Sequence, residues 1–274
     1  MSFLALDPKR PYQELDLGDA SAELREAAEA CFEVARRAGR PRKETFQPVD
    51  DSTVEVAILE RHLAGNVDVF GLASDAELSN AIGFNSRHVA ASIRDGEMRR
   101  VRRSFDDVLR REVARAFAPA RAPLLFWAAD YWYPAGAYMG WHTNNRFPGW
   151  RIYVTHASEP GRSFFRYRDP LSGEVRTSLD ARWMLRFFLV DPKRPLWHAI
   201  YDDAERFSFG YMAHPRALDA AVLPRRPETP PLARDLRRRG AIQLRLHGAP
   251  ALADGAPETP CPRRPRARLL TRSI

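Results

Sequence analysis

The feature that most constrains this chain is a succession of short, strand-like segments between residues 123 and 212, with no helical pattern between them. Each segment is rich in aromatic and β-branched residues and is bounded by Pro, Gly, Asn or Asp. Parallel strands need long crossover connections, usually helices, so their absence here favours a mainly antiparallel sandwich or barrel. The predicted strands are 123–133, 150–156, 163–168, 175–179, 183–190, 197–201 and 207–212.

Amphipathic helices are predicted before these strands. Ser21 can cap a helix over residues 21–38, whose apolar residues recur at intervals of three and four. Residues 96–118 carry one apolar stripe and a solvated, partly basic opposite face. A capping-box pattern from Ser74 to Glu77 predicts a third, short helix that leads toward Gly83. We therefore expect residues 1–122 to form a helical and mixed segment that packs on the strands.

The net charge of +8 is confined to the end of the chain. Residues 216–274 hold 13 arginines against five acidic residues, which leaves the body neutral, and they also hold nine of the 22 prolines. Such a composition buries too little apolar surface to offset its ordering entropy. We expect a disordered Pro/Arg-rich tail, either without a partner or in weak contact with a polyanion, because clustered arginines attract phosphates.

Composition and targeting patterns narrow the class further. With 274 residues, 45% of them hydrophobic, the chain is long enough to close a core. It has no apolar run of about 18 residues and no pattern of a secretory signal, so we expect a cytoplasmic protein that does not cross a membrane. Cys31 and Cys261 have no metal-ligand spacing, so a metal would be held by nitrogen and oxygen.

Two of the seven histidines stand out by their setting. His142 lies where a strand meets a polar turn, in Tyr-Met-Gly-Trp-His-Thr-Asn, and His198 begins a strand. Arg206 and Ser208 follow on the next strand, two residues apart, so both side chains should point into the barrel. Phe207 and Phe209 should then pack behind them. A histidine pair suits a borderline metal, and a guanidinium with a hydroxyl suits a carboxylate.

This arrangement resembles the iron(II) and 2-oxoglutarate-dependent dioxygenases, in particular their prolyl-4-hydroxylase-like branch. The family carries His-x-Asp/Glu on an early strand, a distal His on a late strand, and then Arg or Lys followed at two residues by Ser or Thr. The corresponding elements here are His142-Thr-Asn144, His198, Arg206 and Ser208, and Tyr133-x-x-Gly upstream matches the branch as well.

The resemblance covers about residues 123–213 and implies a fold, an activity and a set of ligands. The fold would be α+β and mainly β: a double-stranded β-helix, or jelly roll, over 123–215, preceded by buttressing helices. Iron(II) would be held by His142, Asn144 and His198, and the cosubstrate 2-oxoglutarate by Tyr133, Arg206 and Ser208. The activity would be O2-dependent hydroxylation of a substrate. Because the body of the chain is neutral, we expect this substrate to be a small molecule or a peptide.

Asn144 departs from the family pattern, which has a carboxylate at this place. Three interpretations remain open. Asn144 is a neutral ligand in a working oxygenase, iron is held by the two histidines and water, or the site is degenerate and binds without catalysing.

Arg186 is a further candidate, because an arginine within an apolar strand needs an anion as a partner. It would meet a carboxylate of the substrate or cosubstrate, or else form a structural ion pair. The alternative function for the whole chain is a degenerate or cupin-like β-barrel that binds a ligand or metal without redox catalysis. A nucleic-acid accessory protein that binds through its tail is a third hypothesis, but the body holds no recognised binding module.

Overall fold

The computed structural model describes residues 7, 10–38, 46–65, 79–84, 96–118 and 123–214. All of them belong to one compact unit, Met1–Pro227. The predicted tail, 216–274, lies outside the described residues, as does the segment 66–78 that contains Ser74 and Glu77. Among the helices that the structure describes, none is both long and apolar enough to cross a membrane.

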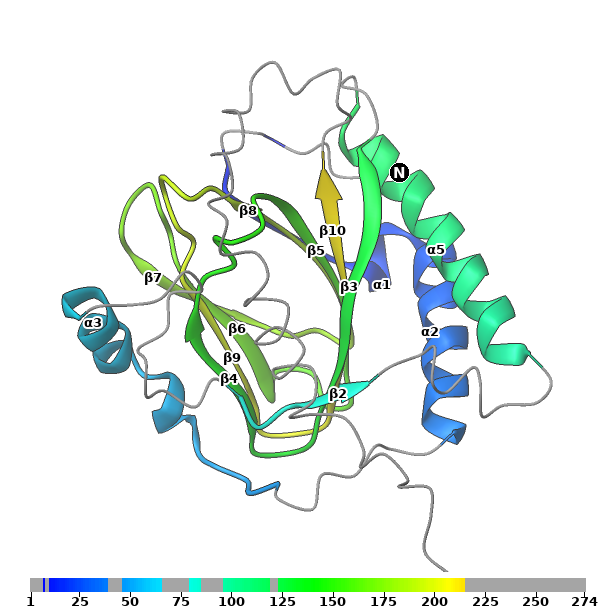
Figure 1. The fold of residues 1–274 in the computed structure, drawn as a ribbon. Helices are drawn as coiled ribbons and strands as arrows, with labels where there is room; N and C mark the ends of the chain where they lie inside the picture. The colour runs from blue at the N-terminus through cyan, green and yellow to red at the C-terminus, as the bar shows by residue number, and fades with distance from the viewer. Residues whose placement is uncertain are drawn as a thin grey trace, which may run out of the picture. The chain divides into compact units, whose positions relative to one another are not determined.

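Two antiparallel sheets form the body of this unit (Figure 1). The larger has the strand order β1-β8-β5-β10-β3-β2, and the smaller has the order β4-β9-β6-β7. The strands are β1 (Tyr12–Asp16), β2 (Ile82–Phe84), β3 (Leu124–Tyr133), β4 (Ala137–His142), β5 (Gly149–Ala157), β6 (Ser163–Arg168), β7 (Val175–Leu179), β8 (Trp183–Val190), β9 (His198–Asp202) and β10 (Arg206–His214).

The strand order is that of a jelly roll. The eight strands from β3 to β10 divide equally between the two sheets, so that β8-β5-β10-β3 faces β4-β9-β6-β7, and every pairing is antiparallel. The expected double-stranded β-helix is confirmed. The strands β1 and β2, which were not predicted, extend the larger sheet at its two edges by pairing with β8 and β3.

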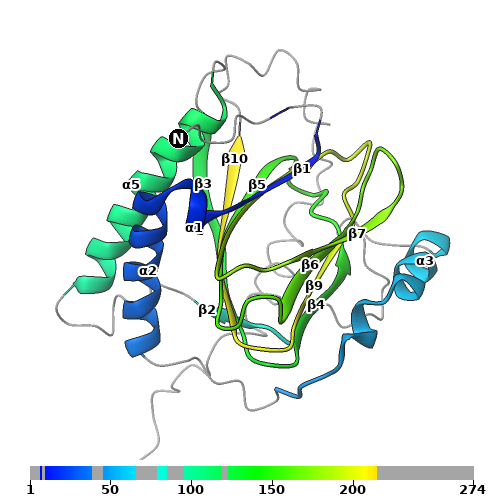
Figure 2. The ribbon, with the colours of Figure 1, turned by 180° about the vertical axis from the view of Figure 1, so that it is seen from behind.

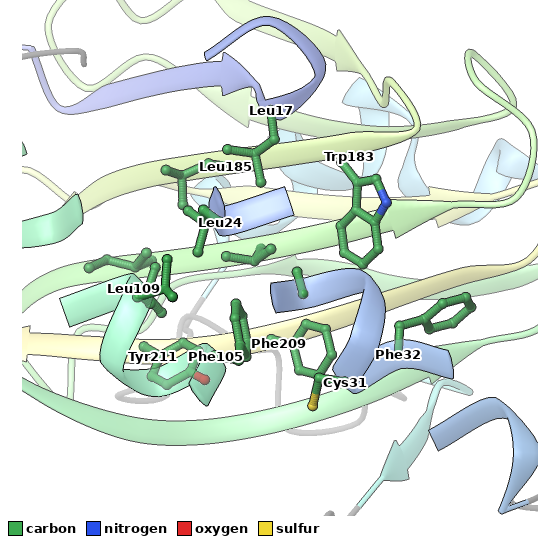
Figure 3. Packing of buried hydrophobic residues seen from close by; sticks show 14 of the residues in the cluster. Leu17, Leu24, Cys31, Phe32, Phe105, Leu109, Trp183, Leu185, Phe209 and Tyr211 are labelled. Carbon is green, nitrogen blue, oxygen red and sulfur yellow. The ribbon is translucent and has the colours of Figure 1, made fainter. Parts of the chain in front are cut away.

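Helices cover the outer face of the larger sheet. The helix α2 (Ala22–Arg37) and the helix α5 (Glu97–Ala116) confirm the predictions for 21–38 and 96–118, and Ser21 caps α2 by accepting a hydrogen bond from the Leu24 amide. Their apolar stripes meet outward-facing residues of the sheet in one continuous core (Figure 3). Phe105 of α5, for example, contacts Phe209 of β10, with their ring centroids 4.8 Å apart.

Shorter helices complete the N-terminal segment. The helix α1 (Leu17–Ala20) follows β1, and a 3-10 helix, η1 (Asp51–Val54), leads into α3 (Val56–Ala64). η1 and α3 supply apolar side chains to a cluster on the outer face of the smaller sheet, and Figure 2 shows α3 on that side. The third predicted helix does not extend to Gly83, because residues 82–84 form strand β2.

Strand alternation determines which residues face the space between the sheets. On β10, Phe207 and Phe209 join the core under the helices, as predicted, so Arg206, Ser208 and Gly210 lie on the opposite, inner face. On β8, Phe188 and Val190 belong to the inner cluster, and Arg186 shares their face. The inner cluster also contains Ala81, Tyr133, Ala137, Phe165, Tyr167, Leu196 and Ile200. The barrel interior is therefore aromatic, with two arginines on one wall.

Candidate metal and carboxylate site

The two histidines meet where β4 pairs with β9. His142 is the register partner of His198, after a shift in the pairing between Met139 and His142. The centroids of their imidazole rings lie 4.1 Å apart, and both side chains are buried. The sheet thus brings together two residues that lie 56 positions apart in the chain.

Backbone carbonyls fix the tautomer of both rings. The Nδ1 atom of His142 lies 2.8 Å from the Gly140 oxygen, and the Nδ1 atom of His198 lies 3.1 Å from the Leu196 oxygen. A carbonyl can only accept, so each Nδ1 carries the hydrogen and each neutral ring keeps its lone pair on Nε2. Metal-binding histidines are commonly oriented by such a bond from the second ring nitrogen.

Burial keeps both rings neutral. It lowers the pKa of His142 to about 4 and the pKa of His198 well below its ordinary value. Phe165 and Phe188 enclose His198, with ring centroids 5.3 Å and 4.8 Å away. Neutral imidazole is the form that binds a metal, so proton competition is weak at pH 7.

Asn144 follows β4 and turns toward the same place. Its Nδ2 lies 3.2 Å from Nε2 of His198, so the amide donates to the nitrogen that would bind a metal. The amide oxygen could occupy this position after rotation of the side chain. The described residues contain no group of three or more His, Cys, Asp or Glu side chains that could hold a metal. The donor set here is therefore two imidazoles and one neutral amide, which fits a weakly held iron(II) ion.

Arg206 lies at the start of β10 and is almost fully buried. Its Nε donates to Asp180 at 2.9 Å, its Nη2 lies 3.4 Å from the Thr155 hydroxyl, and its guanidinium lies 5.0 Å from the centroid of the Tyr133 ring. Its Nη1 is buried without a hydrogen-bond partner among the described residues. Ser208 is also buried on the same face. One guanidinium donor thus remains for an acceptor, which fits a carboxylate ligand such as that of 2-oxoglutarate.

Arg186 has partners within the chain. Its Nη1 bonds to Asp180, its Nη2 donates to Ser178 at 2.8 Å, and its Nε donates to the Tyr12 hydroxyl at 2.9 Å. Glu14 of β1 lies 3.3 Å from the same Nε. Of the two interpretations of Arg186, the observed contacts are those of a structural ion pair.

Two buried aspartates, Asp180 and Asp202, were missed in the sequence. Asp180 precedes β8 and bonds to both arginines, and those two charges overcome the effect of burial and lower its pKa. Asp202 ends β9, with an Oδ1 atom 3.7 Å from Nε of Arg206. The signal was present, because two arginines on inner faces require acids, and strand alternation from His198 places Asp202 inward.

Asp202 has an unusual environment. It is fully buried, and neither of its carboxylate oxygens accepts a hydrogen bond of normal geometry from the described residues. Burial, opposed by the Arg206 charge, raises the pKa of this carboxyl well above its ordinary value. We refer to Arg186, Arg206, Asp180 and Asp202 as the buried charge cluster.

The tryptophans that flank the histidines in sequence lie outside the barrel interior. Trp141 donates to backbone oxygens of η1 and its C-cap, Trp197 shares its cluster, and Trp150 belongs to the core under the helices. His156 stacks on Phe32 of α2, with ring centroids 4.2 Å apart, and is part of the packing. Large aromatic residues near a motif are thus core residues here.

No family model matches the sequence, and comparison with curated proteins finds no relative. Solved structures of similar fold include two prolyl hydroxylases and a plant dioxygenase. A prolyl hydroxylase from Trichoplax adhaerens, in complex with a hypoxia-inducible factor peptide, has a TM-score of 0.43 and 9% identity over 78% of this chain and 88% of that one. A Pseudomonas putida prolyl-4-hydroxylase has a TM-score of 0.36 and 14% identity, over 76% and 94%.

The third is a dioxygenase for auxin oxidation from Arabidopsis thaliana, bound to 2-oxoglutarate, with a TM-score of 0.38 and 12% identity over 76% of this chain and 85% of that one. The assignment of the fold rests on the strand order described above. In that order, and in the sequence of its motif residues, the chain resembles the iron(II) and 2-oxoglutarate-dependent dioxygenases of the prolyl-4-hydroxylase-like branch.

Proposed function

We propose that this protein is an iron(II)- and 2-oxoglutarate-dependent oxygenase that hydroxylates a small-molecule or peptide substrate. The observation that carries the proposal is the pair of buried, neutral imidazoles. Both Nδ1 atoms are held by backbone carbonyls, so each ring keeps its lone pair on Nε2, the nitrogen that would ligate the metal once the Asn144 amide turns away from His198. The motif residues Arg206 and Ser208 line the same barrel and supply the polar groups that a dicarboxylate needs.

Each residue has a definable task. His142 and His198 would hold iron(II), with the amide oxygen of Asn144 as a neutral third ligand. The Nη1 of Arg206 would bind the distal carboxylate of 2-oxoglutarate. Tyr133 and Ser208 would line that end of the site. With both bound, iron(II) and 2-oxoglutarate supply O2 activation coupled to decarboxylation of the 2-oxo acid. The aromatic interior excludes water from that reaction.

A cavity suggests where a substrate enters. It has a volume of about 550 Å³ and lies at β1, β6 and the turn after β6. Tyr167, which lines it, is the register partner of His198 on β6 and stacks on Tyr12, with ring centroids 4.0 Å apart. Both guanidinium and carboxylate groups contribute to the lining. Besides the two tyrosines, the lining residues are Arg10, Pro11, Gln13, Glu14, Asp169, Leu171 and Arg176. Mixed charges beside aromatic rings suit an amino-acid-like molecule or a peptide.

The proposal is tested by anaerobic addition of iron(II) and 2-oxoglutarate, followed by the visible absorption of the chelate and then by succinate formation in air. His142→Ala and His198→Ala should each abolish iron(II) retention. His214→Ala, a partly exposed histidine at the end of β10, is the control and should retain iron. Equal losses of iron from all three variants would contradict the assignment.

The second candidate is a barrel that binds a metal or acid without redox turnover. It is favoured by the bond from Asn144 to His198 and by the lack of a carboxylate in the metal shell. In that case iron(II) and 2-oxoglutarate would bind, but in air the wild-type protein would form no more succinate than the His142→Ala variant.

A further inference from the structure

The buried charge cluster contains an unmatched donor beside unmatched acceptors. Arg206 Nη1 has no hydrogen-bond partner among the described residues, and the same holds for both oxygens of Asp202. Arg206 Nε and Asp202 Oδ1 lie 3.7 Å apart, so these groups occupy one small region of the interior. Leaving such groups buried and unpaired is costly, so a bound molecule that satisfies both is favoured.

Asp180 limits how Arg206 can bind an anion. Asp180 accepts from Nε of Arg206 at 2.9 Å and also bonds to Arg186, so this acid shares both guanidinium charges. Nη2 of Arg206 already lies 3.4 Å from the Thr155 hydroxyl, so Nη1 is the guanidinium nitrogen left without a partner among the described residues. A ligand carboxylate that accepts from Nη1 with one oxygen leaves its other oxygen open to a second donor.

Asp202 is the group placed to be that donor. Strand alternation on β9 directs Asp202 to the inner face that it shares with Ile200 and His198, four residues away. Its Oδ1 lies 3.7 Å from Nε of Arg206, so a ligand carboxylate that reaches this guanidinium also comes close to Asp202. A carboxyl that carries its proton can donate to a ligand carboxylate, whereas an ionised one would repel it.

We propose that Asp202, in its protonated form, is the second donor to the distal carboxylate of the ligand, so that binding of a dicarboxylate takes up one proton wherever free Asp202 is ionised. This inference rests on the proposed function for the identity of the ligand. It makes Asp202 a specificity residue. The ligand carboxylate would accept hydrogen bonds from both Arg206 and Asp202, while Asp180 stays bonded to the guanidinium.

The surroundings of Asp202 support a neutral carboxyl. The charged and titratable groups that face it are Arg206 on β10, Arg186 on β8, Asp180 before β8 and Tyr133 on β3. Its register partners are Ala137 on β4 and Ser163 on β6, which carry no charge, although the Ser163 hydroxyl lowers the pKa of Asp202. Burial outweighs this hydroxyl and the two guanidinium charges, so the pKa of Asp202 is raised.

The test measures binding rather than turnover. Protein loaded with Mn²⁺, which replaces iron(II) without redox chemistry, is titrated by calorimetry with 2-oxoglutarate and with 2-oxobutyrate between pH 6 and pH 9. The second acid keeps the chelating end but lacks the distal carboxylate, so the ratio of the two Kd values isolates the distal end. Wild type is compared with Asp202→Asn, which keeps a donor without a charge, and with Asp202→Ala, which removes the donor.

We expect Asp202→Asn to bind 2-oxoglutarate with a pH-independent Kd ratio, and Asp202→Ala to lose roughly tenfold to hundredfold in that ratio. In wild type the ratio should worsen by up to about tenfold per pH unit above the pKa of Asp202. Equal ratios for the Asn and Ala variants, or a pH slope that survives in Asp202→Asn, would overturn the proposal. If 2-oxobutyrate binds and 2-oxoglutarate binds no better, this inference fails alone; if neither binds, the proposed function fails too.

Discussion

At the scale of single residues, two features of the candidate site bear on how tightly it would hold its proposed ligands. Asn144 is uncharged, and Asp180 already bonds to the guanidinium of Arg206. In the proposed oxygenase, iron(II) would have one negative charge less to hold it than in a site with a carboxylate ligand. A ligand carboxylate would find Nη1 of Arg206 free, but Nε already bonded to Asp180. We therefore expect both ligands to bind more weakly than a carboxylate triad and an unshared arginine would allow.

The Asn144 side chain provides the first direct test of this view. Asn144→Asp should tighten iron(II) binding by roughly tenfold or more, because a charged ligand replaces a neutral one, and Asn144→Ala should weaken it. The Asp variant should also lose the amide donor that now bonds to His198 Nε2. Iron(II) affinity measured by competition with a chromophoric chelator checks both. The same affinity in the Asn, Asp and Ala proteins would place residue 144 outside the metal shell.

At the scale of elements, the central strand β10 depends on a glycine. β10 lies between β3 and β5, and Gly210 is the inward-facing residue opposite Ala129 and Tyr153. A Cβ atom at position 210 would lie 2.7 Å from the Ala129 carbonyl oxygen and 3.0 Å from Cε1 of Tyr153. The backbone oxygen cannot move without disturbing the pairing of β3 with β10.

Gly210→Ala should therefore lower the free energy of unfolding by about 1–3 kcal/mol, the usual cost of overpacking a core. Gly83→Ala is the matched control: Gly83 lies in the edge strand β2, and a Cβ there would meet nothing within 4 Å. Its effect should stay within about 0.5 kcal/mol. Urea unfolding of both variants measures the difference. If the Gly210→Ala protein is as stable as the Gly83→Ala protein, the backbone near β10 must shift to make room for the added methyl group without loss of stability.

Elements with a strong local pattern were predictable, and elements that depend on distant partners were not. The helix α2 has both a cap and an apolar stripe, and the strands β6, β7 and β8 match their predicted bounds. The strands β1 and β2 carry little hydrophobic alternation of their own and form because an edge of the larger sheet is open to them. The capping pattern at Ser74 predicted a helix leading toward Gly83. Residues 82–84 instead form a strand that pairs with β3, since tertiary context overrides local preference.

At the scale of the whole molecule, the sequence predicted the layers better than it predicted the interior charges. The alternation of Phe207 and Phe209 with Arg206 and Ser208 correctly separated the core under the helices from the barrel interior. The partners of the buried arginines could not be predicted in the same way. Asp180 belongs to no strand, and its contact with Arg206 depends on how the turn before β8 meets β10. Such contacts require the three-dimensional arrangement of both sheets.

The buried charge cluster joins strands of both sheets, so it should shape the pH dependence of stability for the whole unit. Its two aspartates act in opposite directions. The pKa of Asp180 is lowered, so its contribution is present above its unfolded pKa near 4 and is lost as the pH falls through the folded value. The pKa of Asp202 is raised, so its contribution is complete below pH 4 and is lost as the pH rises through the folded value.

Asp202→Asn should remove the second of these dependences. In wild type, the folded state keeps the Asp202 proton longer than the unfolded chain, so stability falls by up to about 1.4 kcal/mol per pH unit between pH 4 and the folded pKa. The Asn variant has no proton to lose there. Its melting temperature should therefore decline less than that of wild type from pH 5 to pH 8, and it should exceed the wild-type value at the upper end. Melting curves that stay parallel over this range would mean that Asp202 is ionised in the folded protein, with Arg206 as its counter-charge.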